Sequence, residues 1–143
     1  MTAPGDDEKL LFQRHEGTDS AEIGARLAQE IASRYGPRDE TPFSVQALGA
    51  DGALHCGMNG VTHWRWLYVR HFWVAPERRG QGLGRALMAE VERLAREKGC
   101  AGIYLDTFEE AAAVFYERLG FERCGRIKNF PLGAARIFLA RPL

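Results

Sequence analysis

The sequence contains no apolar run that approaches the roughly 18 residues of a membrane-spanning helix. Its opening stretch, MTAPGDDEKL, is polar and acidic, unlike a secretory signal. Cysteine is scarce: Cys56, Cys100 and Cys124 are odd in number and show no CxxC spacing. These absences argue against a membrane partner, a disulfide framework and a zinc site. We therefore expect a cytoplasmic protein with no bound metal.

An excess of positive charge is also missing. Lysine and arginine total 19, as do aspartate and glutamate, so the formal net charge is zero. Proteins that bind nucleic acid usually carry a basic excess, so we expect no nucleic-acid partner. The length of 143 residues and the hydrophobic content of 45% suit a single domain over residues 1–143, with residues 1–9 as a flexible tail.

The first quarter of the chain predicts one strand and one helix. Residues 10–17, LLFQRHEG, are typical of a short strand. Asp19 is the expected N-cap of the helix that follows, because Glu22 lies three residues later in a capping-box pattern. The helix should end before Gly36-Pro37. Apolar residues at every fourth position predict a stripe that packs on the core, formed by Ile23, Leu27 and Ile31.

Three antiparallel strands should follow. The segments FSVQAL (43–48) and ALHCGMNGVT (53–62) flank GADG, whose Asp-Gly pair is typical of a hairpin turn. The third strand is WRWLYVRHFWV (64–74), and strict alternation assigns its side chains to two faces: Leu67, Val69, His71 and Trp73, against Trp66, Tyr68, Arg70, Phe72 and Val74. Because both sets are mostly bulky and apolar, we expect a central strand covered by helices on both faces.

The second half predicts a strand–helix–strand unit and then a helix with two further strands. A helix over residues 83–98 leads to a strand over 102–107, so it should connect two parallel strands with a right-handed crossover. Thr107 and Glu110 suggest a capping box that opens a helix ending at Leu119. Two strands should close the chain, at 121–127 and 135–143. The expected fold is α+β with a mixed sheet.

A glycine-rich turn, ERRGQGLGR (77–85), lies between the central strand and the helix over 83–98. Alternate glycines let a ligand approach the backbone, and the first amides of the helix, together with the helix dipole, form an anion site. Three arginines add positive charge, so we expect a pyrophosphate-bearing ligand. A Walker loop would need Gly-Lys-Ser/Thr where Gly84-Arg85-Ala86 stands, and GxGxG is not the dinucleotide spacing GxGxxG. The remaining candidate is coenzyme A.

The segment RRGQGLG resembles the R/Q-x-x-G-x-G/A signature of the GNAT acyltransferase superfamily, carried by Arg79, Gly82 and Gly84. Further along, FYERLGF (115–121) resembles the tyrosine-bearing helix end of these enzymes, and the ending NFPLGAARIFLARPL resembles that of small bacterial members. The resemblance implies one GNAT domain, with a central mixed sheet splayed between strands 4 and 5, helices on both faces, and acetyl-CoA bound in the opening.

The same resemblance implies the residues that hold acetyl-CoA. The pantetheine would run along the central strand and bond to the backbone of Phe72 and Val74, where a backbone N–H would also stabilise the oxyanion. Glu109 stands where many members have a cofactor-contacting asparagine, which is a departure from the family. The pyrophosphate would meet the amides of the turn: Arg79, Gly80, Gln81, Gly82, Leu83, Gly84 and Arg85.

Two residues are candidates for proton transfer. Tyr116 matches the family's general acid, a phenol that would protonate the leaving thiolate. A packing role is the alternative for Tyr116, because Gly120 in a Schellman cap would bring Phe121 onto the helix end. His71 is the candidate general base, because histidine accepts protons near neutral pH and a strand bulge would turn it toward the cleft. The alternative role for His71 is that of a core histidine bonded to a backbone carbonyl. Asp106, Glu109 or a water chain would then accept the proton.

The sequence therefore predicts an N-acetyltransferase that moves an acetyl group from acetyl-CoA to a primary amine by direct attack in a ternary complex. The acceptor would be a small molecule or a peptide. Two alternatives stay open: a catalytically silent acyl-CoA-binding sensor or scaffold of the same fold, and a protein lysine or N-terminal acetyltransferase. Homodimers are common among members of the family and would be compatible with this chain.

Overall fold

The computed structural model describes residues 8–143, and the chain divides after Pro37 into two compact units. In the first unit, helix α1 (Ala21–Tyr35) begins after Ser20, whose Oγ accepts a hydrogen bond from the backbone N–H of Ile23 at 3.3 Å. Ser20 therefore takes the N-cap position predicted for Asp19, since its hydroxyl reaches the third amide of the helix. Glu22 consequently forms no capping box and pairs with Arg26 at 2.9 Å.

One further prediction for this first unit is wrong, because residues 10–17 form no strand. The amphipathic period of α1 predicted the helix correctly. The packing of its apolar stripe on the core stays a prediction. The predicted tail lies mostly outside the described residues, and the single domain over residues 1–143 stays a prediction.

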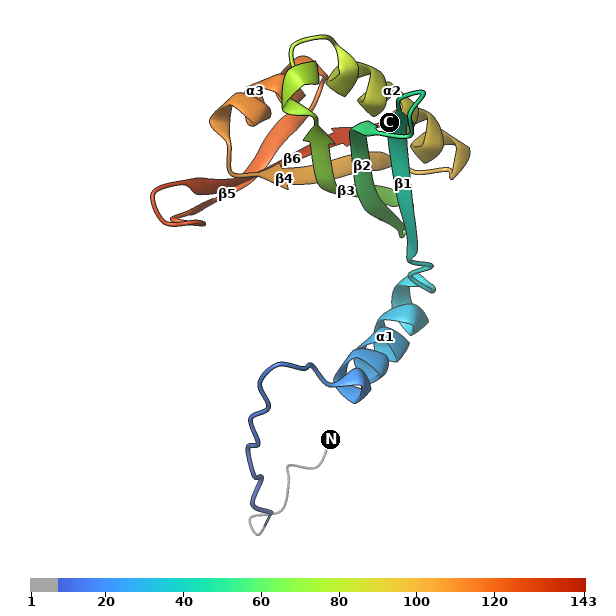
Figure 1. Ribbon diagram of the computed structural model, residues 1–143. Coiled ribbons are helices and arrows are strands. Elements are labelled where there is room, and N and C mark those ends of the chain that lie inside the picture. Colours follow the sequence, from blue (N-terminus) through green and yellow to red (C-terminus); the bar gives the residue numbers. More distant parts are fainter. Residues whose placement is uncertain (1–7) are drawn as a thin grey trace. The chain divides into compact units, whose positions relative to one another are not determined.

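Residues 38–143 fold around a six-stranded mixed sheet (Figure 1). Its strands are β1 (Thr41–Leu48), β2 (Leu54–His63), β3 (Trp66–Val74), β4 (Gly102–Thr107), β5 (Glu122–Lys128) and β6 (Ala135–Pro142). They lie in the order β1-β2-β3-β4-β6-β5, and every neighbouring pair is antiparallel except β3–β4. The predicted α+β class with a mixed sheet is confirmed.

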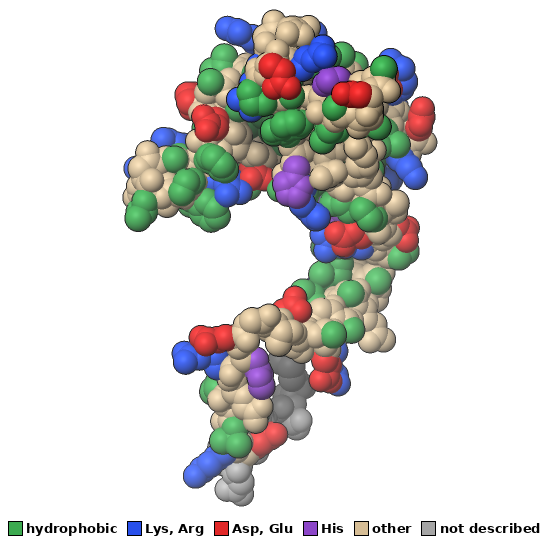
Figure 2. All heavy atoms as spheres, in the orientation of Figure 1, with side chains coloured by type: hydrophobic (Ala, Val, Ile, Leu, Met, Phe, Trp, Pro, Cys, Tyr) green, Lys and Arg blue, Asp and Glu red, His purple; other side chains and the backbone are tan. Residues whose placement is uncertain are grey.

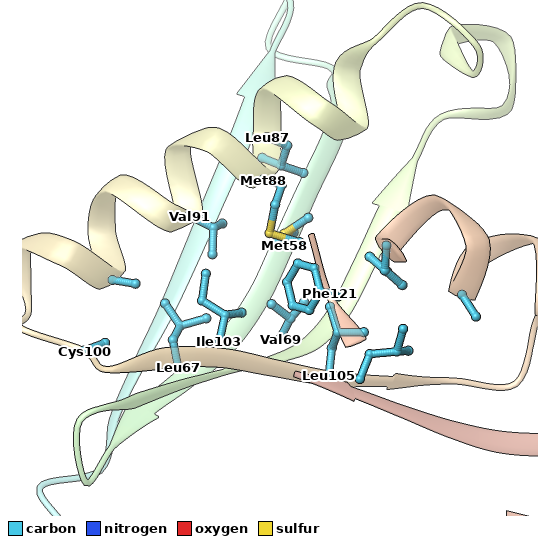
Figure 3. Packing of buried hydrophobic residues seen from close by; sticks show 14 of the residues in the cluster. Met58, Leu67, Val69, Leu87, Met88, Val91, Cys100, Ile103, Leu105 and Phe121 are labelled. Carbon is cyan, nitrogen blue, oxygen red and sulfur yellow. The ribbon is translucent and has the colours of Figure 1, made fainter. Parts of the chain in front are cut away.

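Helix α2 (Leu83–Glu97) connects β3 to β4, and α3 (Glu110–Arg118) connects β4 to β5. Both helices pack on the same face of the sheet (Figure 1). Figure 3 shows Leu87, Met88 and Val91 of α2 pointing toward Ile103 and Leu105 of β4. Within residues 38–143 no helix covers the other face, so helices on both faces are not seen in this unit. None of the helices in residues 8–143 combines the length and apolarity needed to cross a bilayer.

A bulge at Arg70 changes which side chains of β3 share a face. Arg70 is the extra residue, because Val69 pairs with Gly60 while His71 pairs with Asn59 on β2. Beyond the bulge the side chains exchange faces. On the helix-covered face lie Leu67, Val69, Phe72 and Val74, and on the opposite face lie Trp66, Tyr68, His71 and Trp73. Strict alternation therefore assigned the last four residues of this strand, residues 71–74, to the wrong faces.

The sheet opens between β3 and β4. The two strands pair over only four residue pairs, from Trp66 with Gly102 to Val69 with Leu105. Beyond these pairs β3 continues to Val74 and β4 to Thr107 without contact in the ladder, so the strands diverge (Figure 1). The opening lies where the sequence predicted it. The predicted strands 4 and 5 are β3 and β4 of the structure, because the first predicted strand, at residues 10–17, does not form.

Candidate active site

The glycine turn meets the N-terminus of α2 beside the opening of the sheet. Gly80 and Gly82 have φ of 76° and 82°, in the left-handed region that side chains rarely adopt. Gly82 is the N-cap of α2, and no side chain caps the helix there. The first amides of α2 have no partner within the helix, and a Cβ built on Gly80 or Gly82 would meet open space. The turn therefore presents free donors to a ligand, as an anion site requires.

Gly84 has a different role from the other two glycines. A Cβ on Gly84 would come within 2.9 Å of the Phe72 ring and 3.2 Å of the Phe115 ring. The absence of a side chain therefore lets the first turn of α2 pack directly against β3 and α3. Leu83, the first residue of α2, packs partly buried against the same core. The sequence predicted Gly84 as a ligand contact, whereas the structure adds a packing reason for it.

The arginines of the turn are used in two ways. Arg79 donates a hydrogen bond from Nε to the backbone carbonyl of Val74 at 3.0 Å, which ties the turn to the end of β3. Gln81 folds back and donates to the Glu77 carbonyl at 3.2 Å. Arg78 and Arg85 are exposed and form no ion pair with any residue among 8–143. Their positive charge is therefore uncompensated at the mouth of the turn.

The end of β3 offers backbone groups to the opening. Ala75 donates its backbone N–H to the backbone carbonyl of His55, in β2, at 2.8 Å. Because successive residues of a strand direct their backbone groups to opposite sides, those of Val74 and Phe72 point away from β2. Neither residue pairs with β4. The Val74 carbonyl is taken by Arg79, which leaves the Val74 N–H and the Phe72 groups facing the opening. A ligand chain with amides would supply the partners that these groups need.

Tyr116 lies in the aromatic cluster between α3 and β3. The residue is 5% exposed, and its ring contacts the rings of Phe72, Phe115 and Phe121 at centroid distances of 5.5–6.2 Å. Burial, and then the negative charge of Asp106, raise the pKa of Tyr116 to about 12. No residue among 8–143 forms a hydrogen bond with its hydroxyl. The hydroxyl is thus protonated at neutral pH and uncommitted within the protein.

The packing role predicted for Tyr116 is also present. Gly120 has φ of 95°, the Gly120 N–H donates to Glu117, and the Phe121 N–H donates to Tyr116 at 3.1 Å, which is a Schellman cap. Phe121 then packs edge-on against the Tyr116 ring. The ring of Tyr116 therefore belongs to the fold, while its hydroxyl is available to chemistry.

The bulge turns His71 onto the face opposite the helices, where it is exposed. Its Nδ1 lies 3.4 Å from the Asn59 side-chain nitrogen. A buried core histidine bonded to a backbone carbonyl is therefore wrong for His71. A hollow of about 230 Å³ adjoins it, lined by side chains of three strands that include Ser44, Gln46 and Trp73.

Thr107 and Glu110 do not form the predicted capping box of α3. Glu109 is the exposed N-cap residue, and its backbone N–H donates to Thr107 Oγ1 at 3.1 Å. The Glu110 carboxylate instead accepts two hydrogen bonds from Arg123, at 2.6 and 3.1 Å. This ion pair holds the pKa of Glu110 below its usual range. The capping box does not form because Glu109 is the N-cap residue in place of Thr107, and because Arg123 of β5 binds the Glu110 carboxylate.

A polar cluster at the opening was only partly expected. Asp106, which the sequence offered as an alternative base, accepts hydrogen bonds from the Tyr68 hydroxyl and from Arg136, both at 2.7 Å. Tyr68 and Arg136 were not predicted as site residues. Tyr68, Asp106 and Arg136 come from three strands distant in sequence, so no local motif could have marked them. The one available signal was the alternation of side chains along β3, β4 and β6, which places residues of different strands on the same face of the sheet.

Comparison with known proteins agrees with this geometry. Residues 43–123 match the acetyltransferase (GNAT) domain family. This chain belongs to the GNAT acetyltransferase family. Blasticidin-S acetyltransferase of Streptomyces morookaense is 36% identical over 71% of this chain and 75% of its own length. The predicted superfamily and the acyltransferase class are thereby confirmed.

Solved structures show the same GNAT fold. A protein of Agrobacterium tumefaciens, described provisionally as an acetyltransferase, has a TM-score of 0.81 and 31% identity over 94% of this chain and all of its own. A protein of Bacillus anthracis, described provisionally as a streptothricin acetyltransferase, was solved with acetyl coenzyme A. It covers 75% of this chain and 64% of its own length with a TM-score of 0.64, but at 23% identity it supports the fold alone.

The surface of this GNAT domain carries mixed charge. Figure 2 shows basic and acidic side chains interspersed on the face of residues 38–143 that it presents. Formal net charge is zero. The positive charge of the glycine turn is therefore a local feature, because the charges of the whole chain sum to zero.

Proposed function

We propose that this GNAT protein is an N-acetyltransferase that moves an acetyl group from acetyl-CoA to a primary amine of a small molecule, by direct attack in a ternary complex. One observation carries the proposal: an uncapped helix N-terminus with a glycine turn adjoins the opening between β3 and β4. An anion site and an unpaired strand edge side by side suit a ligand with a pyrophosphate at one end and amides in its chain.

The turn and the strand edge would divide the cofactor between them. The amides of residues 79–85 would bind the pyrophosphate, with Arg78 and Arg85 supplying charge. The backbone of Phe72 and Val74 would bind the pantetheine amides. Glu109, exposed at the start of α3, would lie beside the cofactor at the position of the family's asparagine. The Val74 N–H would donate to the oxyanion.

The chemistry requires one bond exchange and one net proton transfer. The neutral amine attacks the thioester carbonyl, a C–N bond forms, and the C–S bond breaks as the thiolate leaves. Tyr116 would donate its hydroxyl proton to that thiolate, and its pKa of about 12 keeps the proton available at neutral pH. The proton lost by the amine would pass to His71 or to water, and a proton returned through solvent to the Tyr116 oxygen would restore both groups for the next turnover.

The assignment of His71 as the base has its own test. The exposed ring of His71 beside the hollow near Trp73 can reach solvent and an incoming amine. We expect His71→Gln to lose the acidic limb of the pH profile of kcat/KM. An unchanged acidic limb would remove His71 as the base and leave Asp106, Glu109 or water.

A small-molecule acceptor is supported by a relative named for blasticidin S rather than for a protein. The deciding experiment measures thiol release from acetyl-CoA with a panel of small amines and of lysine peptides. Release with small amines supports the proposal, and release with peptides alone indicates a protein acetyltransferase. Binding of acetyl-CoA without release in either panel indicates a sensor or scaffold.

Cofactor binding is tested with a matched pair of variants. Gly82 and Gly99 flank opposite ends of α2, both have positive φ, and both have open space at Cβ. Gly82→Val and Gly99→Val should therefore cost similar backbone strain. We expect acetyl-CoA to raise the melting temperature of the wild type and of Gly99→Val, but not of Gly82→Val. Equal stabilisation of both variants would refute the phosphate cradle.

A further inference from the structure

Asp106 lies at the mouth of the opening, on the face that α2 and α3 leave uncovered. Val69 and Leu105 form the last pair of β3 and β4, so Asp106 is the first residue of β4 beyond the ladder. Leu105 points into the helix-covered core, and Asp106 therefore points to the opposite face. An amine that approaches a thioester held in the opening from that face would meet this carboxylate.

Both oxygens of Asp106 are fixed by the protein. Tyr68 donates to Oδ1 and Arg136 donates to Oδ2, each at 2.7 Å. The side chains of Asp106 and Arg136 are only 12% and 26% exposed. A carboxylate held at both oxygens keeps a single orientation, and each oxygen retains a free lone pair for a further donor.

Arg136 is also held between aromatic rings of two loops. Its guanidinium lies 4.2 Å from the centre of the Phe130 ring, in the β5–β6 loop, and 5.6 Å from that of Phe108, in the β4–α3 loop. The Arg136 Nε is buried and has no hydrogen-bond partner among the described residues. It is the one such buried side-chain atom in residues 8–143. A buried donor without an acceptor is unfavourable, so the guanidinium lacks acceptors inside the protein. Its exposed part can donate to a ligand oxygen.

We propose that Asp106 and Arg136 select the acceptor: an amine that carries a hydrogen-bond-accepting oxygen, a carboxylate or a carbonyl, a few bonds from its nitrogen. Asp106 accepts hydrogen bonds from the N–H groups of the amine, while Arg136 donates a hydrogen bond to the oxygen. The Asp106 carboxylate and the Arg136 guanidinium are held side by side. They are complementary to a molecule that carries a hydrogen-bond donor, its amine, and an acceptor oxygen at a similar spacing. This inference rests on the proposed function, whose acceptor it narrows.

The test uses triplets of acceptors that differ in one group: an amino acid, its amide and its decarboxylated amine, for example leucine, leucinamide and isoamylamine. We expect kcat/KM of the wild type to be about ten- to a hundredfold higher for one or both oxygen-bearing members than for the plain amine. Comparing the amino acid with its amide shows whether the site prefers a carboxylate or a carbonyl oxygen.

The variant Arg136→Gln should remove most of this preference and lower the rate with the plain amine much less. Arg126→Gln, which alters an exposed arginine of the neighbouring β5, should keep the wild-type preference. Arg136→Lys, which keeps the charge, serves as the second variant if Arg136→Gln does not fold. Comparing ratios within one protein cancels the intrinsic reactivities of the amines.

Three results would overturn the inference. A wild type that prefers plain amines refutes it without any variant. An equal fall for all members of a triplet in Arg136→Gln gives Arg136 a structural role only, and an unchanged preference removes Arg136 from recognition. The proposed function fails separately, if acetyl-CoA binds and no amine of the panel is acetylated.

Discussion

The two faces of the sheet in residues 38–143 carry different kinds of side chain. On the helix-covered face, Leu67, Ile103 and Leu105 are at most 1% exposed and pack against α2. On the other face, Tyr68 stacks on Tyr104 at 4.8 Å and holds Asp106. The first face stabilises the fold by apolar burial, and the second binds polar groups to one another. A residue's face therefore predicts whether its substitution changes stability or recognition.

The largest effect is expected where one residue serves both purposes. Tyr116 packs its ring on the helix-covered side and leaves its hydroxyl uncommitted. Tyr116→Phe should keep the ring packing, and so the fold, but lower kcat by about a hundred- to ten-thousandfold. Tyr104→Phe, on the opposite face, is the control and should stay close to the wild-type kcat. A normal kcat for Tyr116→Phe would restrict Tyr116 to packing.

Stability should depend on the covered face. Leu105→Ala removes a side chain that is 1% exposed, and we expect a loss of about 2–5 kcal/mol in the free energy of unfolding. Leu132→Ala makes the same truncation at a site that is 89% exposed and should change little. Denaturant titration measures both. Equal losses would mean that the loop of Leu132 is buried in solution.

Gly84→Ala tests the contact between the turn and the aromatic cluster. The new methyl group would lie within 2.9 Å of the Phe72 ring, so we expect a loss of about 1–3 kcal/mol from overpacking, with weaker binding of acetyl-CoA. Gly24→Ala, in α1 with open space around it, should not destabilise. If Gly84→Ala is as stable as the wild type, the rings adjust and the packing reason for Gly84 fails.

The smallest effect concerns two tyrosines on opposite faces. The pKa of Tyr68 is raised to about 12 by burial first and then by its hydrogen bond to Asp106, and the pKa of Tyr116 is raised to about 12 by burial and, less, by the Asp106 charge. Both raised values stabilise the fold below the unfolded pKa near 10, and this stabilisation is lost as pH rises through about 12.

Asp106→Asn separates the two tyrosines. The Tyr68 ionisation should move down, toward its ordinary range, more than that of Tyr116, because only Tyr68 is hydrogen-bonded to Asp106. Alkaline titration of tyrosinate absorbance, with Tyr68→Phe and Tyr116→Phe to assign the two transitions, measures the shifts. Equal shifts for both residues would contradict the difference between the faces.

Much of the fold was predictable because its signals are local. The period of α2, the glycine at its end and the short apolar strand at 102–107 predicted these elements almost to the residue. The glycine turn was predictable because positive φ selects glycine at Gly80 and Gly82. The N-terminal region was predicted less well: the helix period of α1 was correct, but the strand before it was not.

The sequence by itself determined the elements, the turn and the family, because each depends on residues close together in the chain. Only the tertiary structure decided which face His71 occupies, since one extra residue at Arg70 reverses all that follows in the strand. Only the tertiary structure brought Asp106 to Tyr68 and Arg136, because strand register, and not sequence separation, sets which side chains of three strands meet.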